Sequence, residues 1–195
     1  MMDQNHIQNI NSYLDIRKKD YYQTFYDFFE EKKITEVWDI GCASGDFAFL
    51  ASNKINFLCT DKSNDLIKLA KKTRSKKNIN FKVDDIMNCN IEKKFDAVCL
   101  SGTLSTLNDP EIVINKMCNA SKRYIVIHSA LNDEPFDTLI SHKKSNEPKE
   151  AYQNSFNIFS ISTIKRIIRA NGFKEKKIER FQMNQYLCKP ESSDR

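Results

Sequence analysis

Glycine is scarce in this chain, with four in 195 residues. Glycine allows a positive φ and a close approach of the backbone to a ligand, so its few positions are informative. Two of the four, Gly41 and Gly45, lie in one short stretch, VWDIGCASGDFAFL at residues 37–50. This stretch is therefore the first candidate for a functional turn.

Metal-binding and disulfide patterns are also lacking. The chain has three histidines and six cysteines, none of them in a C-x-x-C pair, so zinc and iron–sulfur spacings are absent and no metal site is expected. Cys59 and Cys99 lie in apolar runs and are interpreted as buried thiols, which fits a reducing compartment. No apolar run approaches the about 18 residues of a membrane span, and the N-terminus lacks the apolar core of a signal peptide. We therefore expect a cytoplasmic protein with no membrane partner.

Charge of one sign is in small excess. The 31 basic and 26 acidic residues give a net charge of +5. Lysines cluster at 71–77, 142–144 and 174–177. These clusters can be solvated surface, or they can attract an anionic substrate or RNA. The first interpretation is favoured, so nucleic acid is not expected as a partner.

Strand-like and helix-like patterns alternate along the chain. Short apolar runs predict buried strands at 36–40, 55–60, 79–83, 95–101 and 123–129. Helices are predicted around Tyr21–Phe29, at 46–54, from Ser63 to Thr73, from Asp109–Pro110 to about residue 121, and over Ile161–Ile168 with Gly172 ending it. This alternation predicts an α/β, Rossmann-like fold with a mainly parallel sheet and helices on both faces. A closing hairpin at 173–181 and 185–189 is expected to add one antiparallel strand and to complete a seven-stranded sheet.

The chain, residues 1–195, is interpreted as one domain. Its expected parts are an N-terminal helical cap (1–33), a cofactor-binding core (34–129), an insertion (130–159) and a final helix with its hairpin (160–189). The insertion breaks the alternation of strands and helices. An insertion of this length without a regular pattern is usually functional or disordered. We interpret it as a cap that selects the substrate.

Ligands of parallel α/β sheets bind beyond the carboxyl ends of the strands, so the strand ends carry the chemistry. The first strand ends at Asp39, and the turn after it holds Gly41, Cys42, Ala43 and Gly45. Glycine here lets a ligand press against the backbone, next to the unpaired N–H groups of the following helix. A tight turn with no ligand is the other interpretation.

Carboxylates follow the next two strands. Asp61, with Lys62 after it, is placed to accept hydrogen bonds from both hydroxyls of a ribose, since Ser63 is the better helix cap. In the sequence Asp84-Asp85-Ile86, a carboxylate can accept from an exocyclic amine while Ile86 packs on an aromatic ring. A polar loop remains the alternative there. The fourth strand ends at Ser101, before the third glycine.

The spacing of the glycines separates two cofactor classes. Dinucleotide enzymes use G-x-G-x-x-G with a pyrophosphate over the helix N-terminus. Here the spacing is G-x-x-x-G, and Asp46 would face that pyrophosphate. Both observations disfavour NAD.

Residues 36–102 resemble the cofactor-binding half of class I S-adenosylmethionine-dependent methyltransferases. VWDIGCASG resembles their motif I, with Ala43 in place of the middle glycine; FLCTDKSNDLIKLAKK, INFKVDDIM and FDAVCLSGTLSTLND resemble motifs II to IV. FSISTIKRIIRANGF resembles the late helix, so that the resemblance covers about residues 20–189. Four motifs in this order form a strong signal.

The resemblance implies a small-molecule methyltransferase that uses S-adenosylmethionine and releases S-adenosylhomocysteine. It implies that Asp61 binds the ribose and that Asp85 is favoured over Asp84 as the acid that contacts the adenine. In similar enzymes an N-terminal segment closes over the methionine end of the cofactor. This makes Tyr13, Arg17 and Tyr21 candidates for binding its carboxylate.

The acceptor is expected to be a small, anionic or sugar-linked metabolite that is methylated on oxygen. His128, at the end of the fifth strand, is the best candidate for a catalytic base, and a merely packed histidine is the equal alternative. His142, Lys143 and Tyr152 in the insertion are substrate-binding candidates, although exposed charge also explains the first two. Residues 142–161 faintly resemble small methyltransferases of bacterial surface-glycan and capsule pathways.

Two other function classes stay open at this point. The lysine clusters allow an RNA or protein methyltransferase that docks a macromolecule. A non-catalytic scaffold with the same fold is the third hypothesis, and the intact Gly41, Gly45, Asp61 and Asp85 argue against it. The oligomeric state is not predicted.

Overall fold

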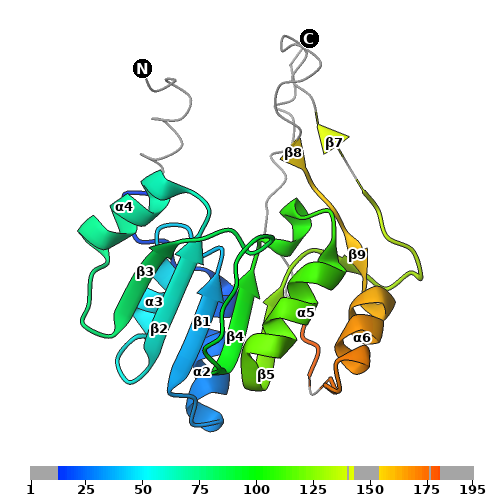
Figure 1. The fold of residues 1–195 in the computed structure, drawn as a ribbon, viewed down its shortest axis with the longest axis horizontal. Coiled ribbons are helices and arrows are strands. Elements are labelled where there is room, and N and C mark those ends of the chain that lie inside the picture. The colour runs from blue at the N-terminus through cyan, green and yellow to red at the C-terminus, as the bar shows by residue number, and fades with distance from the viewer. Residues whose placement is uncertain (1–12, 140, 143–153, 176, 181–195) are drawn as a thin grey trace, which may run out of the picture.

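The computed structural model describes residues 13–139, 141–142, 154–175 and 177–180. Five parallel strands form its central sheet in the order β3–β2–β1–β4–β5 (Figure 1). They are β1 Glu36–Ile40, β2 Asn56–Asp61, β3 Ile79–Val83, β4 Phe95–Ser101 and β5 Ser121–His128. The strand order reverses between β1 and β4, which places the topological switch point of the sheet there.

Helices connect the strands at the positions that the capping residues predict. They are α2 Asp20–Glu31, α3 Asp46–Ala51, α4 Asn64–Thr73, α5 Pro110–Ala120 and α6 Ile161–Ala170, with a 3-10 turn, η1, at Leu104–Thr106. The Ser63 hydroxyl accepts from the N–H of Leu66, and the Asp109 carboxylate accepts from the N–H groups of Glu111 and Ile112. Both predicted N-caps are confirmed.

Each face of the sheet buries its own hydrophobic core. Along β1, Val37 packs with α2, α3 and α4, whereas Trp38 packs with α5 and α6 on the opposite face. This division follows from the two-residue alternation of side chains along a strand. Figure 1 shows α5 and α6 in front of the sheet and α2 behind it. The predicted α/β fold with helices on both faces is confirmed.

Trp38, the single tryptophan, joins β1 to the end of β2. Its side chain is 1% exposed, and its Nε1 donates to the hydroxyl of Thr60 at 2.9 Å. The carbonyl of Thr60 accepts from the N–H groups of Gly41 and Cys42 at 2.8 and 3.0 Å. The parallel pairing of β1 with β2 thus continues beyond the strand into the glycine turn.

The predicted seven-stranded sheet with an antiparallel strand is wrong, because all five strands of the described sheet run parallel. Residues 173–175 and 177–180 belong to no strand, and 185–189 lie outside the described residues. Glu175 pairs with Arg169 and Lys165 of α6, and Arg180 pairs with Asp133. These ion pairs hold the described part of the segment against α6 and the residue after Asn132, and none of its described residues pairs with the sheet.

The insertion has more regular structure than its sequence predicts. β6 Leu131–Asn132 pairs in parallel with β9 Phe159–Ser160, and β7 Ser141–His142 pairs antiparallel with β8 Asn154–Ser155. A bridge between Thr138 and Ile158 lies between these two pairs. We call residues 131–139, 141–142 and 154–160 the ribbon.

Two polar side chains anchor the ribbon to its neighbours. The Asp137 carboxylate accepts from the Ser160 N–H at 2.7 Å and the Thr163 hydroxyl at 3.1 Å, at the start of α6. The Asn157 N–H donates to the carbonyl of Ser105 at 2.6 Å, and its side-chain amide donates to that of Leu107 at 2.8 Å. The ribbon is thereby held against the segment that follows β4.

Candidate functional site

The turn after β1 requires both of its glycines. Gly41 has φ +68° and Gly45 has φ +79°, which is the left-handed region. A Cβ on Gly41 would lie 2.0 Å from Oγ1 of Thr103, and one on Gly45 would lie 2.4 Å from the ring of Phe81. A side chain is therefore excluded at both positions by space as well as by conformation.

Ala43, between the two glycines, is also left-handed, with φ +50°. Such a conformation costs an L-residue roughly 1–2 kcal/mol. The N–H of Ala43 donates to Oδ2 of Asp61 at 2.9 Å. This bond links the turn to the end of β2. Ala43 therefore has the left-handed backbone conformation that suits the glycine found at this position in motif I of the methyltransferases.

Asp61 lies between the turn and the start of α4. Its Oδ2 accepts from Ala43, and its Oδ1 accepts from the N–H of Ser63 at 2.8 Å. Two backbone donors fix the orientation of the carboxylate, and each oxygen retains a further lone pair. Two lone pairs at a fixed spacing suit the adjacent hydroxyls of a ribose. Lys62, beside it, is exposed.

The two carboxylates after β3 differ in their partners. Asp84 forms an ion pair with Lys82 at 2.6 Å, and its N–H donates to the carbonyl of Asp61 at 3.0 Å. Asp85 closes its own turn, because its oxygens accept from the N–H of Met87 at 3.0 Å and the amide of Asn88 at 3.2 Å. Ile86 next to it is buried.

Asp39 is the buried carboxyl of the site. It is 3% exposed, and burial together with the nearby charge of Asp61 raises its pKa from 3.8 to about 7. A cation placed beside it would favour its ionised form. Cys42, two residues beyond Ile40, is half-buried at the same turn. A buried acid of this kind is suited to a positively charged ligand.

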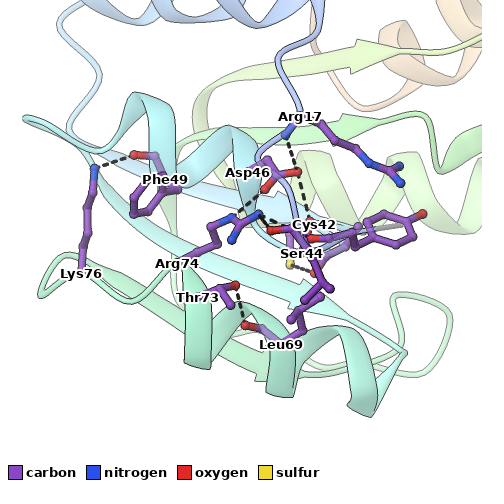
Figure 2. Close-up of polar contacts among 12 residues, drawn as sticks. Arg17, Cys42, Ser44, Asp46, Phe49, Leu69, Thr73, Arg74 and Lys76 are labelled. Carbon is purple, nitrogen blue, oxygen red and sulfur yellow. Dashed lines mark hydrogen bonds and ion pairs between the residues drawn. The ribbon is translucent and has the colours of Figure 1, made fainter. Parts of the chain in front are cut away.

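Asp46 pairs with Arg74, which the sequence analysis assigned to a lysine cluster. The Arg74 Nε lies 2.8 Å from Oδ1 of Asp46, and both side chains are 4% exposed (Figure 2). The other oxygen accepts from the Ser44 hydroxyl at 3.1 Å and the Arg17 N–H at 3.2 Å. Asp46 is therefore bound to this buried arginine, a partner that the sequence analysis did not assign to it.

On the other side of the switch point, three predicted residues meet. The Ser101 hydroxyl donates to Oη of Tyr21 at 2.7 Å, and the ring of Tyr21 stacks on His128 with centroids 3.7 Å apart. Burial, followed by the positive charge of Lys19, lowers the pKa of His128 below its ordinary value. The imidazole is then neutral near pH 7, and the neutral ring has a nitrogen that accepts a proton.

The remaining predicted residues are placed only in part. Arg17 lies just before α2, with its guanidinium carbon 3.9 Å from the centre of the Tyr13 ring. The backbone of His142 lies in β7, and Lys143 and Tyr152 lie outside the described residues. The cofactor candidates and His128 thus lie at one edge of the sheet. The side chains of the substrate candidates His142, Lys143 and Tyr152 are outside the described part of the structure.

The part of the chain that the structure describes contains neither a metal cluster nor a membrane-spanning helix. No group of three or more His, Cys, Asp or Glu residues within them could hold a metal ion. None of the helices they form combines the length and apolar character needed to cross a membrane.

Comparisons with known proteins agree with the geometry. A family model described as a methyltransferase domain matches residues 31–182. The candidate methyltransferase 235L of Invertebrate iridescent virus 6 is 31% identical over 186 residues, which are 88% of this chain and 68% of that protein. Malonyl-[acyl-carrier protein] O-methyltransferase 2 of Ilyobacter polytropus is 27% identical, over 71% of this chain and 55% of its own length.

A solved structure shows the same fold. The sugar N-methyltransferase KedS8 from Streptoalloteichus superposes with a TM-score of 0.63, over 88% of this chain and 85% of that chain, at 12% identity.

Proposed function

The chain belongs to the methyltransferase-domain family, and from this premise we propose that it methylates an oxygen of a small, anionic or sugar-linked metabolite. The cofactor, S-adenosylmethionine, supplies an electrophilic methyl group on a positively charged sulfur and leaves as S-adenosylhomocysteine. The protein contributes mainly position, since aligning acceptor and methyl group removes much of the entropic barrier.

The orientation of the Asp61 carboxylate is the observation on which the proposal rests. Its two oxygens are fixed by the N–H groups of Ala43 and Ser63, and their remaining lone pairs can accept from the two ribose hydroxyls. Asp85 and Ile86, which follow the neighbouring strand β3 at the same edge of the sheet, would contact the adenine. These residues form the nucleoside part of the proposed site.

The methionine part of the cofactor would lie along the glycine turn. Asp39 would face its ammonium and sulfonium charges, and the raised pKa of this carboxyl matches a position that a cation completes. Arg17 and Tyr21, on the segment that enters α2, would bind the carboxylate. Gly41 and Cys42 would let the backbone approach the chain of the cofactor.

The acceptor would lie between the end of β5 and the ribbon. We assign His128 as the base for a hydroxyl acceptor. The acceptor oxygen would form a bond to the methyl carbon as the bond from that carbon to sulfur breaks. The electron pair of the broken bond would stay on sulfur, and the hydroxyl proton would pass to the imidazole of His128. His142, Lys143 and Tyr152 are the proposed selectors of the acceptor.

The names of one relative and one structural neighbour guide the choice of this class of acceptor. One relative is named an O-methyltransferase of a malonyl carrier protein, and one structural neighbour is named a sugar N-methyltransferase. The chain spans about half the length of the malonyl enzyme, so these names guide the choice of substrates to test. A role in capsule or surface-glycan modification is part of the same proposal.

An RNA or protein acceptor is less well supported by the cluster at 71–77. Its arginine, Arg74, is buried, and the Lys76 ammonium is bonded to the carbonyl of Phe49 at 2.5 Å. The cluster is thus no uniformly exposed basic surface, which docking of a nucleic acid requires.

Calorimetry with S-adenosylhomocysteine tests the proposal directly. We expect the wild type to bind and Asp61→Ala to bind about 100-fold more weakly, because two charge-assisted hydrogen bonds are lost. Asp27→Ala, an exposed carboxylate on α2, is the matched control and should leave the affinity unchanged. A wild type that does not bind, or an Asp61→Ala variant that binds equally, contradicts the proposal.

A further inference from the structure

Arg74 connects two parts of the chain that are distant in sequence. Its Nε is bonded to Asp46, and its Nη2 donates to the carbonyl of Leu14 at 3.0 Å and lies 3.5 Å from that of Tyr13. One guanidinium thus holds the first residue of α3 and the backbone that precedes α2. Figure 2 shows Arg74 and Asp46 pointing toward each other beneath this segment.

Asp46 completes the connection from the other side. The carboxylate oxygen that Arg74 Nε does not contact accepts from the backbone N–H of Arg17 and from the hydroxyl of Ser44. We call residues 13–19 the N-terminal strap. The strap is therefore held twice, through its carbonyls by Arg74 and through one amide by Asp46. Ser44 ties the same carboxylate to the glycine turn.

The burial of this pair distinguishes it from ion pairs at the surface. Both side chains are 4% exposed, whereas in the pair of Lys82 with Asp84 they are 53% and 17% exposed. An exposed pair contributes little, but removal of one partner from a buried pair leaves an uncompensated charge and is strongly destabilising. The position of the strap therefore depends on both members of this buried pair being present.

We propose that Arg74 is a positioning residue for the methionine end of the cofactor. It acts through the strap, which presents Arg17 and leads into Tyr21, and it does not itself touch the cofactor. This inference rests on the proposed function of the site. The Asp61 carboxylate, assigned to the nucleoside, is held by other bonds: it accepts from the N–H groups of Ala43 and Ser63, whereas the bonds of Arg74 go to Asp46, Tyr13 and Leu14.

The separation of the two parts gives a selective test. Calorimetry of Arg74→Met should use two probes, S-adenosylhomocysteine and 5′-methylthioadenosine, which has the same nucleoside and sulfur without the amino-acid end. We expect the affinity for S-adenosylhomocysteine to fall about tenfold or more, while that for methylthioadenosine changes by less than about twofold. A parallel fall of both affinities, or no change in either, would overturn the inference.

Two further variants protect the test against misfolding. Asp46→Asn combined with Arg74→Met removes both charges together, so no lone charge is buried, and the same selective loss is expected from it. Lys72→Met, an exposed position two residues before Arg74, is the matched control and should bind both probes normally. A wild type that binds neither probe overturns the proposed function itself, which distinguishes the two failures.

Discussion

The two halves of the carboxyl edge of the sheet are held in different ways. In the nucleoside half, at the ends of β1, β2 and β3, the Asp61 carboxylate is bonded to backbone N–H groups. In the proposed acceptor half, at the ends of β4 and β5, the contacts join side chains: Ser101 to Tyr21, which is also proposed to bind the cofactor carboxylate, and Tyr21 to His128. Contacts to the backbone survive most substitutions, whereas contacts between side chains change with a single one. This difference matches the proposed function, in which one cofactor is kept and the acceptor can vary.

His128→Asn gives the largest expected effect and tests the acceptor half. Loss of a general base should lower kcat by about 100-fold or more, while the affinity for S-adenosylhomocysteine stays within about twofold. The kcat of the wild type should fall at low pH, because protonation of His128 removes the base. The fall should begin below pH 6.5, because burial and the charge of Lys19 lower the pKa of His128. An unchanged kcat would mean that the acceptor is already anionic, as a carboxylate is.

The pH dependence of cofactor binding tests Asp39 in the nucleoside half. Its pKa of about 7 means that the ionised form, which attracts a cation, is scarce at acid pH. The affinity for S-adenosylhomocysteine should rise by up to about tenfold per pH unit and level off above about pH 7. Calorimetry between pH 5 and 8.5 measures this slope, and Asp39→Asn should abolish it.

The same carboxyl affects folding with the opposite slope. Its pKa is raised in the folded protein, so its contribution to stability is fully present below 3.8 and is lost as the pH rises through about 7. Asp39→Asn should therefore raise Tm more at pH 8 than at pH 5. Equal shifts at both pH values would contradict the assignment.

Substitution of two glycines, one from each half, distinguishes the cost of a steric clash from the cost of a left-handed backbone. Gly41→Ala should destabilise the protein by about 2–3 kcal/mol, because the new Cβ would clash with Thr103. Gly102→Ala should destabilise it by about 1 kcal/mol, because that backbone is left-handed but no atom lies near the new Cβ. Urea unfolding measures both. Thr103→Ala added to Gly41→Ala should recover part of the loss, and equal costs for the two glycines would count against the crowding.

Ala43→Gly has the smallest expected effect. Relief of the left-handed alanine should stabilise the protein by about 0.5–1 kcal/mol, after the greater freedom of glycine in the unfolded chain is taken into account. The bond from the residue 43 N–H to Asp61 is kept, so cofactor affinity should not change. A loss of stability would show that this turn does not strain the alanine.

The sequence predicts the five parallel strands well, since their signals are local. β1, β3 and β4 have the predicted bounds because each is an apolar run that ends at a turn residue. Gly172, with φ +77°, follows α6 as the predicted terminator. The backbone-bound position of Asp61 agrees with the inference that Ser63 serves as the cap, which frees the carboxylate for another role.

Long-range contacts explain what the sequence does not predict. Arg74 lies in a run of lysines, and only its pairing with Asp46, 28 residues away, distinguishes it from a solvated charge. A single arginine among lysines was the available signal, since a planar guanidinium suits a buried pair. The two-residue strands of the ribbon are too short for periodicity to detect. The charged segment after α6 alternates like a strand, yet its partners are side chains of α6 and Asp133.

The bond from Trp38 to Thr60 gives the protein a built-in optical probe. As the single tryptophan, Trp38 accounts for all the indole fluorescence of the chain. It precedes Asp39 on β1, and its hydrogen-bond partner precedes Asp61 on β2. Its emission should be that of a buried indole and should shift to longer wavelength on unfolding. Titration of the cofactor and denaturation of the fold can therefore both be followed from one unlabelled residue.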